Sequence, residues 1–266
     1  MRPGSRAVML ALAASLVGGA GCLLTSDFGG IVGVRPAEGE GEGGAADGAS
    51  TEDAGGAAGA CTGEEHTFCT DFDDITEPPV PGWQVVQRGG GTVTLDRASA
   101  VTEPHSIGMS ISGGESPAAF LLRDVALGSF KTVTLGFDFR LVDCPAQVEN
   151  SLTFVYLGVG TGTAYGFVIL SSGSLALGSA VGTDNAFFPL ETLVQPGEWA
   201  RIVVTLTAKT ATELHLGLTV NGAASVDTDA PTGPPKSTLQ IELGAQGVAA
   251  PKGCQVAYDN VVLDKE

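Results

Sequence analysis

Hydrophobic and polar residues alternate with a period of two along most of the chain after Cys61. Between Val133 and Leu141, every odd position is large and apolar, and every even position is small, polar or charged. This period is typical of a β-strand that places one face on a hydrophobic core. The same alternation recurs in the segments 107–111, 214–220 and 239–243. Two other segments, 152–159 and 201–207, have apolar residues on both parities or nearly so, which predicts central strands covered on both faces.

Turn signals separate these segments, among them Gly113-Gly114, Pro196-Gly197 and Asn221-Gly222. An Asn-Gly pair directly after an alternating segment favours a tight β-hairpin. No stretch of ten or more residues after Cys61 shows the apolar stripe of a helix. The pattern therefore predicts an all-β domain over residues 61–266, built as a sandwich of two antiparallel sheets.

The first 21 residues have the layout of a secretory signal peptide. Arg2 and Arg6 precede an apolar run from Ala7 to Val17 that is too short to span a bilayer. The small residues Gly19-Ala20-Gly21 then lead to Cys22, which resembles the lipobox of bacterial lipoproteins, although Gly19 stands where that family usually has Leu or Val. The resemblance implies a lipid on Cys22 and a membrane anchor. Leu23 follows, so the Asp that retains such proteins in the inner membrane is absent, and the outer membrane is favoured.

Residues 22–60 are rich in Gly, Ala and acidic residues and contain little that a core needs. They are expected to form a disordered tether between the anchor and the domain. The whole chain has a formal net charge of −17. This charge argues against nucleic acid as a partner and against adsorption on anionic lipid through surface charge.

Four cysteines remain after Cys22, namely Cys61, Cys69, Cys144 and Cys254. An even number in an exported chain indicates two disulfides, for which three pairings exist. We favour Cys61–Cys69 as a local link and Cys144–Cys254 as a bridge between distant strands. Zinc is disfavoured because the chain has no Cys-x-x-Cys pair and its three histidines are scattered.

The order of several motifs resembles the laminin-G-like branch of the concanavalin A-like lectin/glucanase superfamily. These motifs are Phe72-Asp73-Asp74, Pro196-Gly197-Glu198-Trp199, Asn221-Gly222 and Tyr258-Asp259-Asn260, and the resemblance covers about residues 68–265. It implies a jelly roll whose concave sheet is often used for glycans, and it places Trp199 in the core.

The same resemblance implies a structural calcium ion between the opening segment of the domain and its last strand, held by Asp71, Asp73 and Asp259. Carboxylate oxygens suit calcium. Asp259 shares its parity with apolar residues, which is costly without a metal or a donor. The alternative is that Asp259 accepts hydrogen bonds from backbone amides of the opening segment.

No motif indicates catalysis. The Glu-x-Asp-x-x-Glu run of the glucanases and a nucleophile elbow are both absent, so we assign no catalytic residue. Tyr156 and Tyr165 flank a glycine-rich stretch and are the candidate ligand contacts. The sequence thus favours a lectin-like module that binds a polysaccharide or an envelope protein. The alternatives are a structural envelope lipoprotein without a glycan site and an unusual glycan-active enzyme.

Overall fold

The computed structural model describes residues 61, 65–76, 80–113, 116–145, 151–160, 162–170, 172, 174–191, 194–233, 235–247 and 253–266. The predicted signal peptide (1–21), the lipidation site Cys22 and the tether (22–60) lie outside these residues. The described part of the chain contains no helix that is long and apolar enough to cross a membrane.

The described residues form fifteen β-strands in chain order. These are β1 (Phe68–Thr70), β2 (Gln84–Arg88), β3 (Thr92–Asp96), β4 (Ser106–Ile111), β5 (Ala118–Ala126), β6 (Thr132–Asp143), β7 (Leu152–Gly160), β8 (Thr163–Ile169), β9 (Leu175–Val181), β10 (Asp184–Pro189), β11 (Trp199–Thr210), β12 (Glu213–Val220), β13 (Ala223–Pro231), β14 (Pro235–Gly247) and β15 (Cys254–Lys265).

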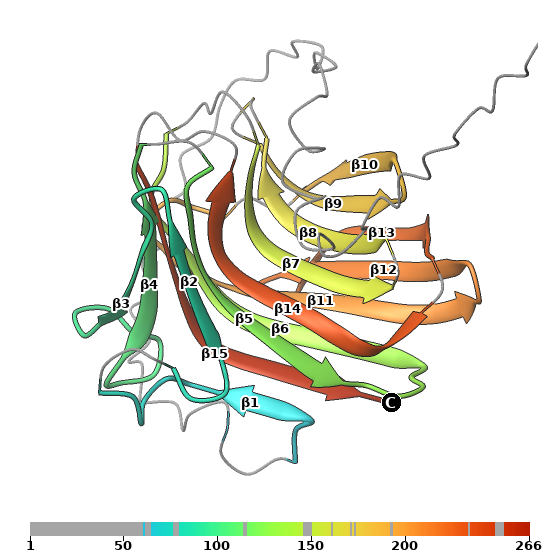
Figure 1. The fold of residues 1–266 in the computed structure, drawn as a ribbon, viewed down its shortest axis with the longest axis horizontal. Coiled ribbons are helices and arrows are strands. Elements are labelled where there is room, and N and C mark those ends of the chain that lie inside the picture. Colours follow the sequence, from blue (N-terminus) through green and yellow to red (C-terminus); the bar gives the residue numbers. More distant parts are fainter. Residues whose placement is uncertain are drawn as a thin grey trace, which may run out of the picture.

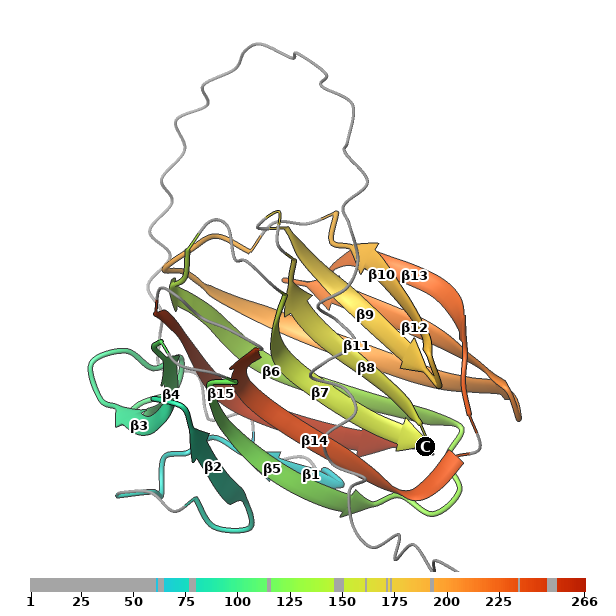
Figure 2. The ribbon, with the colours of Figure 1, turned by 45° about the horizontal axis from the view of Figure 1, so that its top comes forward.

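The strands form two sheets that pack face to face (Figures 1 and 2). The eight-stranded sheet has the order β13-β12-β11-β6-β15-β4-β3, with β1 added beside β15. The seven-stranded sheet has the order β10-β9-β8-β7-β14-β5-β2. Every pairing of neighbouring strands is antiparallel. The predicted all-β, two-sheet antiparallel sandwich is confirmed.

The alternating segments place their apolar residues between the two sheets, as their period predicts. In β6, Val133, Leu135, Phe137 and Phe139 are buried in one continuous core. The expectation for 201–207 was wrong in one respect. β11 alternates between buried and half-buried positions, because its second face lies on the outside of the sheet.

Aromatic side chains fill the centre of the core. Phe139 packs against Phe154, Phe167 and Tyr258, with ring centroids 5.2 to 5.5 Å apart. The hydroxyl of Tyr258, which belongs to the eight-stranded sheet, lies 2.6 Å from the carbonyl oxygen of Phe154 and 2.8 Å from that of Gly244 in the other sheet. A buried Tyr hydroxyl needs such partners, and here they link the two layers.

The two predicted disulfides are confirmed. Cys61 is bonded to Cys69 in β1, across eight residues of sequence. Cys144, just after β6, is bonded to Cys254 at the start of β15, across 110 residues. The second bond joins two neighbouring strands of the eight-stranded sheet that are far apart in the chain.

Charged side chains line β13 at one edge of the eight-stranded sheet. Asp229 accepts hydrogen bonds from Lys209 Nζ at 2.5 Å and from His215 Nδ1 at 2.9 Å. Asp227 lies 2.8 Å from the other ring nitrogen of His215. This edge strand therefore carries two exposed carboxylates, of Asp227 and Asp229.

Candidate functional site

A group of polar side chains lies on the outer face of the seven-stranded sheet. Leu239, Ile241 and Leu243 of β14 point into the core, so the residues between them point outward. We call the polar group the Glu242 cluster. It consists of Gln240, Glu242 and Gln246 on β14, Tyr156 on β7 and Arg88 on β2.

Both oxygens of the Glu242 carboxylate accept a hydrogen bond from a side-chain amide of the same strand. Gln240 Nε2 lies 3.3 Å from Oε1, and Gln246 Nε2 lies 2.9 Å from Oε2. Tyr156 stands directly opposite Glu242 in the pairing of β14 with β7. The two glutamines therefore fix the carboxylate next to the tyrosine.

Partial burial shifts the pKa values of both central groups. Burial raises the pKa of Glu242, while the hydrogen bond from Gln246 and the positive charge of Arg88 act in the opposite direction. Burial, and then the charge of Glu242, raises the pKa of Tyr156 to about 12. Tyr156 thus keeps its proton near neutral pH, and the cluster offers both hydrogen-bond donors and acceptors.

A glycine gives the Tyr156 ring its position. A Cβ atom on Gly158 would lie 3.1 Å from Tyr156 Cε1 and 3.3 Å from the Tyr156 hydroxyl, so the ring lies across this residue. Beyond Tyr156, the outward positions of β8 and β9 are small: Ala164, Gly166 and Val168 stand opposite Ala180, Gly178 and Ala176. The cluster thus combines a half-buried aromatic ring with polar groups, and the small residues beside it are themselves buried.

The prediction for Tyr165 was wrong, while Tyr156 faces outward as a ligand contact requires. Tyr165 points into the core and is completely buried, and its hydroxyl donates a hydrogen bond to the Pro231 carbonyl at 3.0 Å. The reason is the register of β7 with β8, which places Tyr165 opposite Leu157 and Tyr156 opposite Gly166. The two tyrosines therefore lie on opposite faces of one sheet.

The predicted calcium site is also wrong, because the structure does not bring its three carboxylates together. Asp71 Oδ1 accepts from the backbone amide of Asp73, and Asp73 Oδ1 accepts from that of His105, both at 3.4 Å. Across the described residues, no three His, Cys, Asp or Glu side chains gather in a way that suits a metal ion.

Asp259 instead holds a loop. One of its carboxylate oxygens accepts hydrogen bonds from the backbone amides of Val101 at 2.8 Å and Thr102 at 3.1 Å, and the other accepts from that of Asn260 at 2.8 Å. The alternative expectation was that Asp259 accepts hydrogen bonds from backbone amides, and the type of donor was predicted correctly. The donors come from the β3–β4 loop and from β15, not from the opening segment.

A second buried carboxylate, Asp138 of β6, stands opposite Asp259 in the sheet. Its Oδ2 accepts from the Asn260 side-chain amide at 2.8 Å, and Arg201 Nη1 lies 3.6 Å from its Oδ1. Burial raises the pKa of Asp138, while the hydrogen bond from Asn260 and the charge of Arg201 lower it. Two carboxylates are thus buried side by side, with an amide and a guanidinium as partners.

We expect the stability of the protein to fall as pH rises from about 4 to about 7. Burial is the largest cause that raises the pKa of Asp259 from 3.8 to about 7; the amides of Thr102, Val101 and Asn260 oppose the shift, and Asp138 adds to it. The folded state therefore keeps this proton over a range where the unfolded state loses it. The stabilisation is complete below pH 3.8 and is lost as pH rises through about 7.

Denaturation by urea at several pH values measures this effect. The Asp259 contribution is at most about 1.4 kcal/mol per pH unit. Asp259→Asn does not titrate, so its stability should vary less with pH than that of the wild type. Equal slopes for the two proteins would contradict the assignment.

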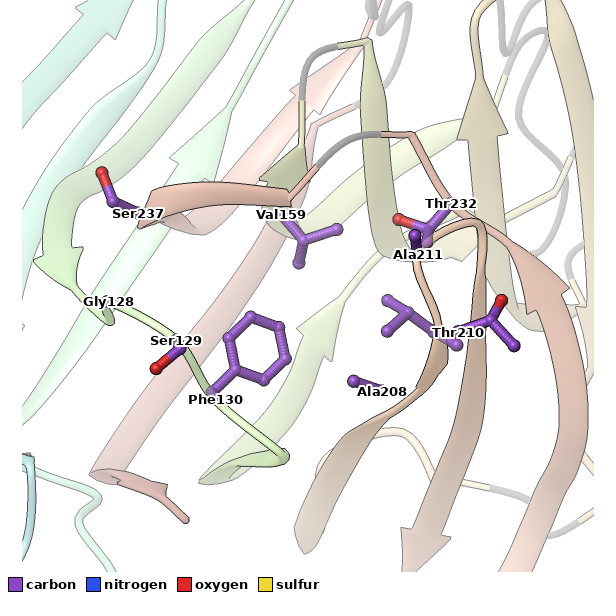
Figure 3. A pocket seen from close by; sticks show the side chains of 10 residues that line it. Gly128, Ser129, Phe130, Val159, Ala208, Thr210, Ala211, Thr232 and Ser237 are labelled. Carbon is purple, nitrogen blue, oxygen red and sulfur yellow. The ribbon is translucent and has the colours of Figure 1, made fainter.

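A separate hollow opens at the end of the sandwich, with a volume of about 370 Å³ (Figure 3). Phe130, Val159 and Leu214 give it an apolar lining, and Ser129, Thr210, Thr232 and Ser237 add hydroxyl groups. None of the described residues in its lining has a titratable side chain.

No protein-family model matches the sequence, and no curated protein matches it either. Several solved structures share the fold. An endo-β-1,4-glucuronan lyase from the fungus Trichoderma reesei is 16% identical, covers 76% of this chain and 96% of its own, and has a TM-score of 0.60. The cellulose-induced protein Cip1 is 16% identical over 74% of this chain and 96% of its own, with a TM-score of 0.58.

A marine PL-14 alginate lyase from Aplysia kurodai is 10% identical, covers 65% of this chain and 87% of its own, and has a TM-score of 0.51. At these identities the likeness concerns the fold alone. The fold of this chain is a concanavalin A-like jelly roll, as the sequence motifs predicted.

Proposed function

We propose that the chain is an exported lipoprotein that binds a polysaccharide through the Glu242 cluster. The observation that carries this proposal is the pairing of Tyr156 with a carboxylate whose two oxygens are held by amides. Sugars present hydroxyl groups that donate and accept hydrogen bonds, and they present C–H faces that pack on aromatic rings. The cluster offers partners for both.

The fold likeness favours a polysaccharide as the ligand, since the names of similar structures mention glucuronan and alginate. The charge of this chain favours a neutral one. A polyuronate carries a carboxylate on each sugar and needs cations to face it. The Glu242 cluster contains a single cation, Arg88, and that charge already acts on Glu242.

The predicted signal peptide, lipidation site and tether complete the proposal. A lipid on Cys22 and a tether over 22–60 would hold the domain away from a membrane, with the outer membrane favoured. In this arrangement the glycan belongs to the cell envelope or to its surroundings. Mass spectrometry of the mature N-terminus tests the anchor, and an unmodified chain that starts elsewhere would remove that part of the proposal.

A glycan-active enzyme is the second candidate. The partial burial of Glu242 favours it, because burial shifts the pKa of the carboxyl group in the direction that a general acid needs. Hydrolysis also requires a second carboxylate across the sugar. Asp124 of β5 stands opposite Gln240 on the same face. Products formed from a polysaccharide by the wild type, and not by Glu242→Gln, would favour this candidate over a binding module.

Tyr156→Ala should weaken polysaccharide binding about five- to tenfold, since an aromatic contact of this kind contributes roughly 1 to 1.5 kcal/mol. Affinity electrophoresis of the full chain in gels containing glucomannan, xyloglucan, mixed-linkage β-glucan or alginate measures the retention. Thr205→Ala, on the outer face of the other sheet, is the control and should bind as the wild type does. The proposal is wrong if no neutral polysaccharide retards the chain, or if Tyr156→Ala is retarded as strongly as the control.

A further inference from the structure

A second hollow lies on the outer face of the eight-stranded sheet, the face opposite to that of the Glu242 cluster. Its volume is about 820 Å³, which lies within the range of sites for small molecules. The β3–β4 loop contributes Arg97, Ser99, Glu103 and His105 to its lining. Strand β6 contributes Arg140, and the start of β11 contributes Trp199 with Glu198 just before it. We call it the Trp199 hollow.

Trp199 was expected in the core, but the structure places it on this outer face. Ala200 and Ile202 point inward, so Trp199 points outward, directly opposite Arg140 in the pairing of β11 with β6. The side chain is half-buried. An aromatic surface is therefore available in the hollow, next to a guanidinium.

The polar walls of the hollow are held in place. Arg140 donates through Nε to the Gly197 carbonyl at 2.7 Å, and its Nη1 donates to the Ser99 hydroxyl. The Ser99 carbonyl in turn accepts from the Ser106 hydroxyl at 2.6 Å. The carboxylate of Asp259 on β15 also fixes the β3–β4 loop, because it accepts hydrogen bonds from the amides of Val101 and Thr102. A site ordered before its ligand arrives loses less entropy on binding.

The charges around the hollow balance. Two guanidinium groups, of Arg97 and Arg140, are matched by two carboxylates, of Glu103 and Glu198. An anionic ligand would face both carboxylates, and a cationic ligand would face both guanidinium groups. A neutral molecule with many hydroxyl groups fits both, since guanidinium donates to a hydroxyl oxygen and carboxylate accepts from a hydroxyl hydrogen.

We propose that the Trp199 hollow binds a neutral sugar residue. The C–H face of the sugar packs on the Trp199 ring, and its hydroxyl groups bond to Arg140 and to the two glutamates. This site is separate from the Glu242 cluster, and the argument for it does not depend on that cluster.

Trp fluorescence tests this proposal, because the chain has two tryptophans and the other, Trp83, is only 6% exposed. In full-length Trp83→Phe, Trp199 is the single fluorophore. Cellobiose, maltose, mannobiose, xylobiose, lactose and chitobiose are the probes, and acrylamide is the quencher. At least one neutral disaccharide should lower the quenching constant of Trp199 about twofold or more, since a pocket of this kind buries most of its ligand.

The variants Glu103→Gln and Glu198→Gln, in the same background, should lose this protection at least in part. The matched control Glu191→Gln removes a charge from an exposed position that does not line the hollow and should keep it. Tyr156→Ala should also keep it, so that failure at one site is distinguishable from failure at the other. The proposal is overturned if none of the neutral probes protects Trp199, if digalacturonate protects it better than they do, or if Glu191→Gln weakens the protection as much as Glu198→Gln.

Discussion

Asp259→Ala should lower the free energy of unfolding by about 3 to 5 kcal/mol, because it leaves two buried backbone donors and one part-buried donor without this acceptor. The amides of Val101, Thr102 and Asn260 all donate to this carboxylate, which is completely buried. The β3–β4 loop also loses its attachment to β15. Denaturation by guanidinium chloride, followed by far-UV circular dichroism, measures the change.

Asp184→Ala is the matched control for this experiment. Asp184 is exposed at the start of β10, so its replacement should change the stability by no more than about 0.5 kcal/mol. A similar small effect for Asp259→Ala would show that the carboxylate does not hold the loop.

Removal of the Cys144–Cys254 disulfide by a double substitution to alanine should destabilise the protein by about 4.7 kcal/mol in the chain-entropy model. The bond closes a loop of 110 residues, so the unfolded chain gains much conformational freedom without it. Thermal unfolding of the variant and the wild type, each without reductant, measures the loss.

The Cys61–Cys69 disulfide provides an internal comparison. It spans eight residues, and its removal should cost about 2.5 kcal/mol on the same basis. An equal or larger loss for the short loop would mean that local packing, not loop closure, dominates both bonds.

The strands were predictable from the sequence because a strand with one buried face carries an apolar residue at every second position. Residues 133–141 show this most clearly, and β6 covers them. The disulfides were predictable because the four cysteines after Cys22 allow only three pairings. Both predictions rest on a local pattern or on a count of residues. Neither depends on the register between strands that are distant in the sequence.

The residues of the site could not be predicted in the same way, because they depend on the register between neighbouring strands. Tyr156 and Tyr165 flank one glycine-rich turn, but a shift of one residue in the register exchanges the two faces of a strand. The pairing of β7 with β8 sends one tyrosine outward and the other into the core.

Asp259 shows a similar limit. Its parity matches that of Val261 and Leu263, yet the register of β15 with β6 shifts between Asp259 and Val262, and Asn260 adopts a φ of +47°. This β-bulge inserts one residue, so Tyr258 and Val261 both point inward while Asp259 faces the β3–β4 loop. A polar residue on the apolar parity of a strand signalled the irregularity, although it did not identify the partner.

At high protein concentration, the acidic edge formed by β13 affects how copies of the chain associate. An uncovered edge strand can accept the edge of another chain, and repeated pairing of this kind builds fibrils. Asp227 and Asp229 would bring like charges together whenever two such edges met. These two carboxylates therefore oppose pairing between copies of this chain through β13.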